Sequence, residues 1–551
     1  MKKYCSLALA LALTLGLTAC GGKTTETQKP TESEAGTGDS TVAITAAIGA
    51  QFSTFDPAMN TEAQNGAVLL HLYSGLFRQD ENAVPQKELC EDYTVSEDGK
   101  TYTFTLKEGL KWSDGSPLTA YDFEYAYLRG LSFGADAVYN MNTMCNYVEG
   151  ATEYEEKALE MGDSFDCTKE DHSYVGATAL DELTFELKLK SPCPHLLQLL
   201  TGYTWTALPQ STPQHVGLWA FEGGYPTSGP FTLKEANPTE KAVLVKNPNY
   251  WNADKVTCDE LTYQVMTDQA SQLLSFQKGD IDVALSISLD YAASYAGTDS
   301  LWSIERSSNY YLAINSGAKG PEWAKDVKIR KALALAIDSA AIADVLGSDF
   351  YTPIYGLVPY GCSDAQGDFR TNRDAQPYTI KYDPEGAKAL LAEAGYTDSN
   401  PLTISYKYSN NGIHGDVATM LEQFWSAIGV NVQFESVESG VFYDQLDAGD
   451  FEVARYGYNS SIAMQQLQIW TTSNQIVAAV DDEYYNNLYE ETLQIADTEE
   501  YFKGVHALED YLIQEQVYLI PILNQNTAAL RSPAFEGYTT NASTPYFAYI
   551  H

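Results

Sequence analysis

Apolar and polar residues alternate in several stretches of the chain, as they do in strands with one buried face. In VSEDGKTYTFTLKEGLKW, Tyr102, Phe104 and Leu106 alternate with polar residues just after Asp98-Gly99. Aspartate and glycine tolerate the left-handed backbone of a tight turn, so Asp-Gly between extended segments is typical of a β-hairpin. Residues 183–190, LTFELKLK, alternate in the same way. We therefore expect a hairpin near residue 98 and another strand at 183–190.

Other segments have the periodicity and the end signals of helices. Residues 326–347 begin with Asp326, a favourable N-cap, and end at Gly347, which predicts one helix over this range. In YDPEGAKALLAEAGY, Asp383 is the expected cap, Pro384 the first helical residue and Gly395 the stop. Both segments have the lengths and caps of helices in a globular protein.

A third helix leads directly into a strand. Within DVATMLEQFWSAIGVNVQFESV, Gly429 ends the helix, and alternating apolar residues begin a strand immediately afterwards. The apolar face of this helix consists of Val417, Met420, Leu421, Phe424, Trp425 and Ile428. A helix, a tight turn and a strand in this order are typical of an α/β layer.

The first forty residues have the features of an export signal and a tether. Lys2 and Lys3 precede an apolar run at 7–17 that is shorter than the about 20 residues of a membrane span. Leu17-Thr18-Ala19-Cys20 resembles the lipobox of bacterial lipoproteins, so we expect 1–19 to be a signal peptide and Cys20 to carry the lipid. Ordinary secretory cleavage beside a chance cysteine is the alternative. Residues 21–40 have no aromatic residue, Leu, Ile or Val, and should be a disordered tether.

Composition narrows the class of protein further. The net charge of −41 repels nucleic acid and anionic lipid headgroups, and it suits solubility at a cell surface. The length of 551 residues favours two or three domains. Six cysteines lie beyond Cys20, and an even number outside the cytosol permits disulfides. Cys145 and Cys167 are the preferred pair, and buried free thiols are the alternative.

The sequence contains no recognisable catalytic or metal-binding motif. GxSxG, HExxH and a phosphate-binding GxxxxGK[ST] are absent, and the seven histidines lack the spacing of metal ligands. We therefore expect neither an enzyme, nor a metal site, nor a cofactor. The chain has 39 tyrosines and 8 tryptophans. Their large, stiff rings suit a cleft that holds varied ligands.

Five internal segments carry a resemblance to a known family. They are TFDPAMNTEAQNGAVLLHLYSGLF (54–77), SEDGKTYTFTLKEGLKWSDGSPLTAYDFEYAYLR (96–129), SGPFTLKEANPTEKAVLVKNPNYWNADKV (228–256), VKIRKALALAIDSAAIADVL (327–346) and YDPEGAKALLAEAGY (382–396). In this order they resemble the oligopeptide- and dipeptide-binding lipoproteins of ABC importers, the extracellular solute-binding proteins of family 5. The resemblance covers nearly everything from residue 41 onward.

The resemblance implies an α/β fold of the type II periplasmic-binding-protein kind, with two lobes that close on a ligand. Mixed sheets flanked by helices form the lobes, and two hinge crossings join them. By analogy, lobe I takes residues 41–73, 200–306 and 524–551, an inserted extra domain takes 74–199, and lobe II takes 307–523. YYLAIN (310–315) resembles one crossing, and the return falls near 521–527.

The ligand contacts follow from the same resemblance. Many relatives have an Arg-x-Gly-Trp segment followed by an Asp that pairs with the peptide's α-ammonium, and RYGY (455–458) matches its first part with Tyr in place of Trp. Ser461 stands where that Asp would be. Either another acid supplies the anchor, with Glu62, Asp481 and Asp482 as candidates, or the ligand has no free amino terminus. The expected ligand-binding residues are Arg455, Gly457, Tyr458, Asn459, Ser460, Ser461, Thr61, Glu62, Tyr139 and Tyr310.

The resemblance also implies a role and a location. We expect a monomer, lipid-anchored to the outer face of the cytoplasmic membrane, that delivers short peptides to a membrane permease. A cell surface is favoured over a periplasm. Two alternatives stay open. The same scaffold could bind an opine, a metal chelate, haem or an oligosaccharide, or the protein could sense a peptide signal without transport.

Overall fold

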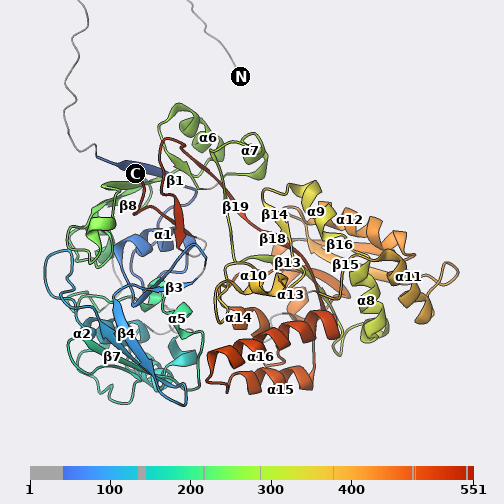
Figure 1. Cartoon of the computed structure of the whole chain (residues 1–551), viewed down its shortest axis with the longest axis horizontal. Coiled ribbons are helices and arrows are strands. Elements are labelled where there is room, and N and C mark those ends of the chain that lie inside the picture. Colours follow the sequence, from blue (N-terminus) through green and yellow to red (C-terminus); the bar gives the residue numbers. More distant parts are fainter. Residues whose placement is uncertain are drawn as a thin grey trace, which may run out of the picture. The chain divides into compact units, whose positions relative to one another are not determined.

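The computed structural model describes residues 41–551 except 83, 134–143, 215–217, 286, 376–377, 474–476, 478 and 542–543. The predicted signal peptide, Cys20, the tether and Tyr139 lie outside the described residues. Within this part of the chain, three larger sheets and two short ones are flanked by helices (Figure 1). The short sheets pair β2 (Phe77–Gln79) with β3 (Pro85–Lys87) and β20 (Thr539–Asn541) with β21 (Thr544–Tyr546).

The first large sheet has seven strands, and its centre is parallel. β1 (Ala43–Ile48) lies between β10 (Glu260–Val265) and β11 (Val283–Ala284) and runs parallel to both. The outer strands are antiparallel to their neighbours. They are β8 (Phe231–Asn237), β9 (Lys241–Lys246), β12 (Leu301–Ile304) and β19 (Thr527–Arg531). Its helices are α1 (Ala63–Leu72), α6 (Gln269–Lys278) and α7 (Leu289–Ala293).

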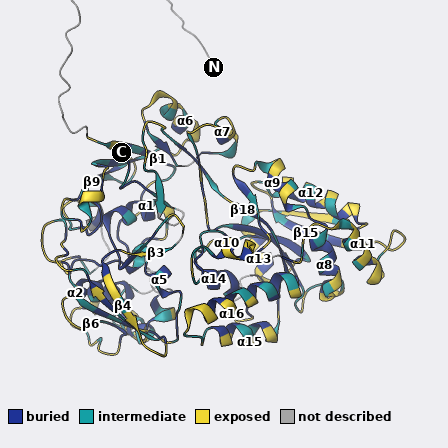
Figure 2. Ribbon diagram, viewed as in Figure 1, coloured by how far each residue is buried: buried dark blue, intermediate teal, exposed yellow. Residues whose placement is uncertain are grey.

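A four-stranded antiparallel sheet contains the predicted hairpin. β4 (Cys90–Val95) pairs with β5 (Thr101–Leu106), and Gly99 has φ +68° in the turn between them. The predicted strand at 183–190 is β7 (Thr184–Lys188), which pairs with β5 and with β6 (Ala177–Ala179). Both predictions are confirmed. β4 is exposed along most of its length (Figure 2), and the associated helices are α2 (Ala120–Leu131), α4 (Ala151–Met161) and α5 (Leu196–Leu199).

The third sheet has six strands in the order β14-β18-β13-β17-β15-β16. They are β13 (Asn309–Ile314), β14 (Tyr351–Pro353), β15 (Thr403–Ser409), β16 (Asn431–Val437), β17 (Val453–Tyr456) and β18 (Leu519–Gln525). β15 runs parallel to both β16 and β17. Along β13, Tyr311 and Ala313 join one apolar cluster, and Leu312 and Ile314 join a second, so this strand supplies core to both faces of its sheet.

The helices around the third sheet fit the predictions except at one place. α11 (Pro384–Glu393) has Asp383 as its cap, and α12 (His414–Ala427) is followed by Gly429 at φ +83° and then by β16. The single helix predicted at 326–347 is wrong, because the chain forms α8 (Val327–Leu335) and α9 (Ser339–Leu346). Asp338 caps the second of these through Ala341 N. The others are α10 (Phe369–Asp374), α13 (Ser439–Asp447), α14 (Ala463–Gln468), α15 (Glu483–Thr492) and α16 (Thr498–Asp510).

Two connections join the seven-stranded and six-stranded sheets. The chain passes from β12 to β13 through residues 305–308, and it returns from β18 to β19 at Asn526 (Figure 1). The return falls in the predicted segment. The first crossing precedes the predicted residues 310–315, because β13 is buried at every position inside the second of these sheets. We call the parts built on these two sheets lobe I and lobe II. Their exact boundaries, and those of the inserted domain, stay a prediction.

The structure also bears on disulfide bonds and on membrane-spanning helices. All six cysteines from Cys90 to Cys362 are free thiols, so the predicted Cys145–Cys167 disulfide is wrong. The Cys145 thiol instead lies 3.6 Å from a carboxylate oxygen of Glu155, and Cys167 is buried. In the described part of the chain, no helix has the length and apolar character needed to cross a membrane.

Candidate functional site

The polar side chains of interest in lobe II lie where parallel strands end. β15 and β17 run in the same direction, and their carboxyl ends bring Ser409 and Arg455 together. In open α/β sheets, ligands bind in the crevice outside the carboxyl ends of parallel strands. The sheet therefore places a hydroxyl and a guanidinium at the position where such folds hold solutes.

Arg455 is nearly buried, with 8% of its surface exposed. Its Nη2 donates to Ser409 Oγ at 2.6 Å and to Tyr443 Oη at 3.2 Å. The guanidinium carbon also lies 4.8 Å from the ring centre of Phe442 and 5.6 Å from that of Tyr443. Two helix side chains from α13 and one strand residue thus hold the guanidinium in place without neutralising it.

No described carboxylate pairs with Arg455, and its buried Nε has no hydrogen-bond partner among the described residues. Burial, and after it the charge of Arg455, lowers the pKa of His414 to about 4. A buried charge without a counter-ion is costly to keep. An arginine fork matches the geometry of a carboxylate, so the position suits a carboxylate-bearing ligand.

Tyr310, another predicted contact, belongs to the same cluster. Its hydroxyl lies 3.3 Å from that of Tyr406, and its ring centre is 5.5 Å from that of His414. Burial raises the pKa of Tyr310 to about 12, so its hydroxyl stays protonated. The structure therefore brings Tyr310 and Arg455 together. It adds Ser409, Tyr443 and His414, which the sequence analysis did not single out.

The loop after β17 is tied closely to β13. Gly457 approaches the backbone so closely that a Cβ there would collide with the carbonyl oxygen of Asn309. Tyr458 N donates to Asn309 Oδ1 at 3.0 Å, and Asn459 forms an isolated bridge with Ser308. Gly457 is thus required by a backbone contact, which places the predicted residues 457–459 beside the connection between the lobes.

Ser460 and Ser461 have different roles in this loop. Ser460 Oγ donates to Gln465 Oε1 at 2.7 Å and accepts from Ile462 N at 3.1 Å, so it organises the turn. The carbonyl oxygen of Ser461 accepts from the side-chain amide of Gln198. The half-buried hydroxyl of Ser461 has no partner in the part of the chain that is described. A carboxylate at this position would therefore meet few protein groups that could bind it in place of a ligand.

Lobe I has a cavity of about 500 Å³ at the corresponding edge of its sheet. Ile48 and Gly49 at the end of β1, Thr267 after β10 and Leu285 after β11 contribute to its wall. Helix α1 adds Gln64. The carboxyl ends of parallel strands thus form this cavity, just as they bring Ser409 and Arg455 together in lobe II.

Thr61 and Glu62 precede α1 beside this cavity. Glu62 Oε2 accepts from Ser53 Oγ at 2.7 Å, Gln64 Nε2 at 2.8 Å and Asn65 Nδ2 at 3.0 Å, and Thr61 is exposed. No described cation pairs with Glu62. By contrast, the candidate Asp482 caps α15 and accepts from the hydroxyls of Tyr511 and Tyr518 at 2.9 and 2.8 Å, so its carboxylate is fully engaged within lobe II.

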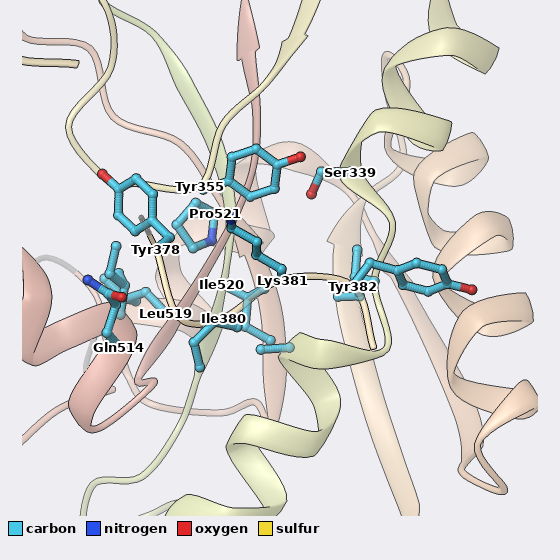
Figure 3. Close-up of a pocket in the computed structure, with 13 residues that line it drawn as sticks. Ser339, Tyr355, Tyr378, Ile380, Lys381, Tyr382, Gln514, Leu519, Ile520 and Pro521 are labelled. Atoms are coloured by element: carbon cyan, nitrogen blue, oxygen red, sulfur yellow. The ribbon is translucent and has the colours of Figure 1, made fainter. Parts of the chain in front are cut away.

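A second hollow lies between β18 and the segment 378–382, where the rings of Tyr355 and Tyr378 lie near Pro521 (Figure 3). Its free space is about 30 Å³, which is room for about one water molecule. This hollow is therefore too small to hold a solute.

Two α/β lobes, joined by two connections and with polar side chains at the carboxyl ends of parallel strands, define a type II periplasmic-binding-protein fold. The family model for bacterial extracellular solute-binding proteins, family 5, matches residues 84–476. The chain therefore belongs to this family. Its members are binding proteins, so the chain is a solute-binding protein and not an enzyme.

Individual proteins that are similar to this chain support the same family assignment. The periplasmic oligopeptide-binding protein OppA of Escherichia coli is 27% identical over 500 residues, which cover 89% of this chain and 88% of OppA. The dipeptide-binding protein DppE of Bacillus subtilis is 26% identical over 549 residues, 98% of this chain and 96% of DppE. The unliganded open form of the murein tripeptide-binding protein MppA has a TM-score of 0.80 at 21% identity, covering 93% of this chain and 97% of MppA.

Proposed function

We propose that this protein captures short peptides between its two lobes and delivers them to the membrane permease of an ABC importer. The observation that carries this proposal is Arg455, a buried guanidinium at the carboxyl edge of lobe II with no carboxylate partner among the described residues. Every unmodified peptide has an α-carboxylate that matches it. The names of the relatives, which bind oligopeptides and dipeptides, support the same ligand class.

The peptide's amino end needs a partner as well. Ser461 has no charge, and the carboxylate of Asp482 is used by two tyrosines. Glu62 is beside the lobe I cavity, and in the described part of the chain its carboxylate accepts hydrogen bonds only from neutral groups. It is therefore the acid that we assign to the α-ammonium. Thr61, Tyr310 and residues 457–461 complete the proposed contacts, and Tyr139 stays a proposal from sequence.

The remaining parts of the proposal concern location and assembly. A lipid on Cys20 anchors a monomer to the outer face of the cytoplasmic membrane, since stable anchoring takes two or more acyl chains and the lipobox modification supplies them. The tether at 21–40 lets the lobes reorient near the permease. Lobe I takes 41–73, 200–306 and 524–551, the inserted domain 74–199, and lobe II 307–523, and they close around the ligand.

Calorimetry with matched peptides tests this function. Tri- and tetrapeptides with free ends should bind at micromolar concentration or below. C-terminal amidation removes the charge that pairs with Arg455, so it should weaken binding by at least about tenfold. Acetylation of the amino end tests Glu62 in the same way. The absence of heat with every peptide would contradict the proposal. Mass spectrometry of molecules released by denaturation would then identify an opine, chelate, haem or sugar instead.

A further inference from the structure

The lobe I cavity differs from its surroundings in its charge. The chain has 74 acidic and 33 basic residues, yet no acidic side chain lines this cavity in the described part of the chain. Among the described residues, Arg306 is the one charged side chain in its lining. The polar remainder consists of neutral amides and hydroxyls, from Gln64, Gln269, Thr267, Thr527 and Thr544.

Arg306 comes from the connection that leads out of lobe I. It follows β12 by two residues, and Thr527, the first residue of β19 after the return connection, lines the same cavity. No hydrogen bond or ion pair joins Arg306 to any described residue, and its side chain is exposed. The guanidinium is therefore available at the place where the two connections meet the cavity.

One neutral donor of the cavity wall, the Gln64 amide, is already used. Gln64 Nε2 donates to Gln51 O at 3.1 Å and to Glu62 Oε2 at 2.8 Å, so it cannot also serve a ligand. An anionic group in the cavity would therefore find its strongest partner in Arg306. About 500 Å³ holds an acidic side chain together with several waters that fill the space around it.

We infer that this cavity is a side-chain subsite, in which Arg306 binds the carboxylate of an acidic residue of the peptide. The inference rests on the proposed peptide-binding function and makes it more specific. The protein should prefer peptides with Glu or Asp at one position over otherwise identical peptides with Gln or Asn. Arg306 then determines this specificity and does not contribute to the affinity common to all peptides.

A set of isosteric peptides tests the inference. Alanine tetrapeptides with Glu placed at each position in turn are compared with the same peptides carrying Gln, using the whole chain and calorimetry. At one position, Glu should bind about tenfold or more tightly than Gln, since a hydrogen bond to a charged group gives that much. The preference should decrease as the salt concentration rises.

The variant Arg306→Gln gives the second part of the test. It should abolish the preference for Glu and leave the affinity for the Gln peptides within about twofold, because Arg306 is exposed and makes no hydrogen bond or ion pair with any described residue. Arg531→Gln is the matched control. Arg531 also lies in lobe I, but it stacks on Trp302 and Tyr538, so the preference should persist in that variant.

The outcomes separate the two proposals. Equal binding of Glu and Gln peptides at every position would overturn the subsite and leave the peptide-binding function intact. A uniform loss of affinity for all peptides in Arg306→Gln would also overturn it, because Arg306 would then hold a group common to all peptides. Failure of every peptide to bind would contradict the peptide-binding function itself, and with it the subsite.

Discussion

Arg129 and Arg455 are both buried, and they are held in opposite ways. Arg129 is 0% exposed, and its two Nη atoms donate to the two carboxylate oxygens of Asp56 at 3.0 and 2.6 Å. Its Nε donates to Pro213 O at 2.8 Å. Among the described residues, Arg455 donates only to the hydroxyls of Ser409 and Tyr443. The first arginine is neutralised inside the fold, and the second keeps its charge.

Other buried arginines of lobe II make the contrast clearer. Arg370, also 0% exposed, donates to both carboxylate oxygens of Glu509 at 3.2 and 2.9 Å. Arg330 donates hydrogen bonds to the carbonyl oxygens of Gln516 and Ala324 at 2.7 and 2.6 Å. These three structural arginines thus donate to acids or to carbonyl oxygens. Arg455 donates to neither among the described residues, and a ligand carboxylate would supply that partner.

The largest expected effect is on the paired arginine. Asp56→Ala leaves Arg129 buried without a counter-ion, so the free energy of unfolding should fall by about 3–5 kcal/mol. Urea denaturation followed by tryptophan fluorescence measures this. Asp92→Ala is the control, since Asp92 pairs with Lys87 at 2.9 Å on the exposed surface, where an ion pair adds little to stability. A similarly small loss of unfolding free energy for Asp56→Ala would mean that pairing with Asp56 does not distinguish Arg129 from Arg455.

The unpaired arginine should show the reverse pattern. Arg455→Met removes the charge but keeps the length of the side chain, so peptide affinity should fall by about 2–5 kcal/mol. The unfolding free energy should stay within about 1 kcal/mol or rise, because an uncompensated buried charge is lost. Calorimetry and urea denaturation of the same sample measure both. Unchanged affinity with a large loss of stability would make Arg455 a structural residue like Arg129.

Local signals explain why much of the fold could be predicted. Asp98-Gly99, Asp383 with Pro384, and Gly429 act within a few residues of themselves, and each appears where the sequence indicated. The break at 336–338 was missed for a similar local reason. The sequence prediction rested on the end signals Asp326 and Gly347, but Asp338 between them accepts a hydrogen bond from Ala341 N and begins a new helix.

The site was only partly predictable, because its partners are distant in sequence. The segment 455–458 was found by its resemblance to relatives. Ser409 is 46 residues from Arg455 and Tyr443 is 12 residues away, and the pairing of β15 with β17 brings them together. Ordinary serines and tyrosines have no sequence signal of this role. Arg306 likewise became a candidate only when the cavity beside it was known.

A buried histidine extends the comparison to pH. His195 Nδ1 lies 2.8 Å from Tyr501 Oη, and Nε2 lies 3.2 Å from Tyr147 Oη and 3.5 Å from Cys193 Sγ. Burial lowers its pKa to about 4. Between pH 6.5 and 4 the unfolded chain takes up a proton that the folded chain excludes. Stability should therefore fall as pH falls through this window, by up to about 1.4 kcal/mol per pH unit from this residue.

The variant His195→Phe isolates that contribution. Phenylalanine keeps a ring against Tyr501 but cannot titrate, so its unfolding free energy should depend less steeply on pH between 6.5 and 4.5. Urea denaturation at a series of pH values measures the two slopes, and contributions from carboxylates cancel in their difference. Equal slopes for His195→Phe and the original protein would mean that His195 is already protonated inside the fold.

The smallest expected effect comes from adding a charge to the site of the unpaired arginine. Ser461→Asp places a carboxylate in the loop after β17, where the Ser461 hydroxyl has no partner among the described residues. If this side chain faces the bound amino end, peptides with a free amine should bind roughly tenfold more tightly, while acetylated peptides gain nothing. If the new acid pairs with Arg455 instead, all peptides with a free carboxylate should bind less tightly, whether acetylated or not. Calorimetry with the four combinations of free and blocked ends distinguishes these results, and an unchanged affinity for all four would remove Ser461 from the ligand contacts.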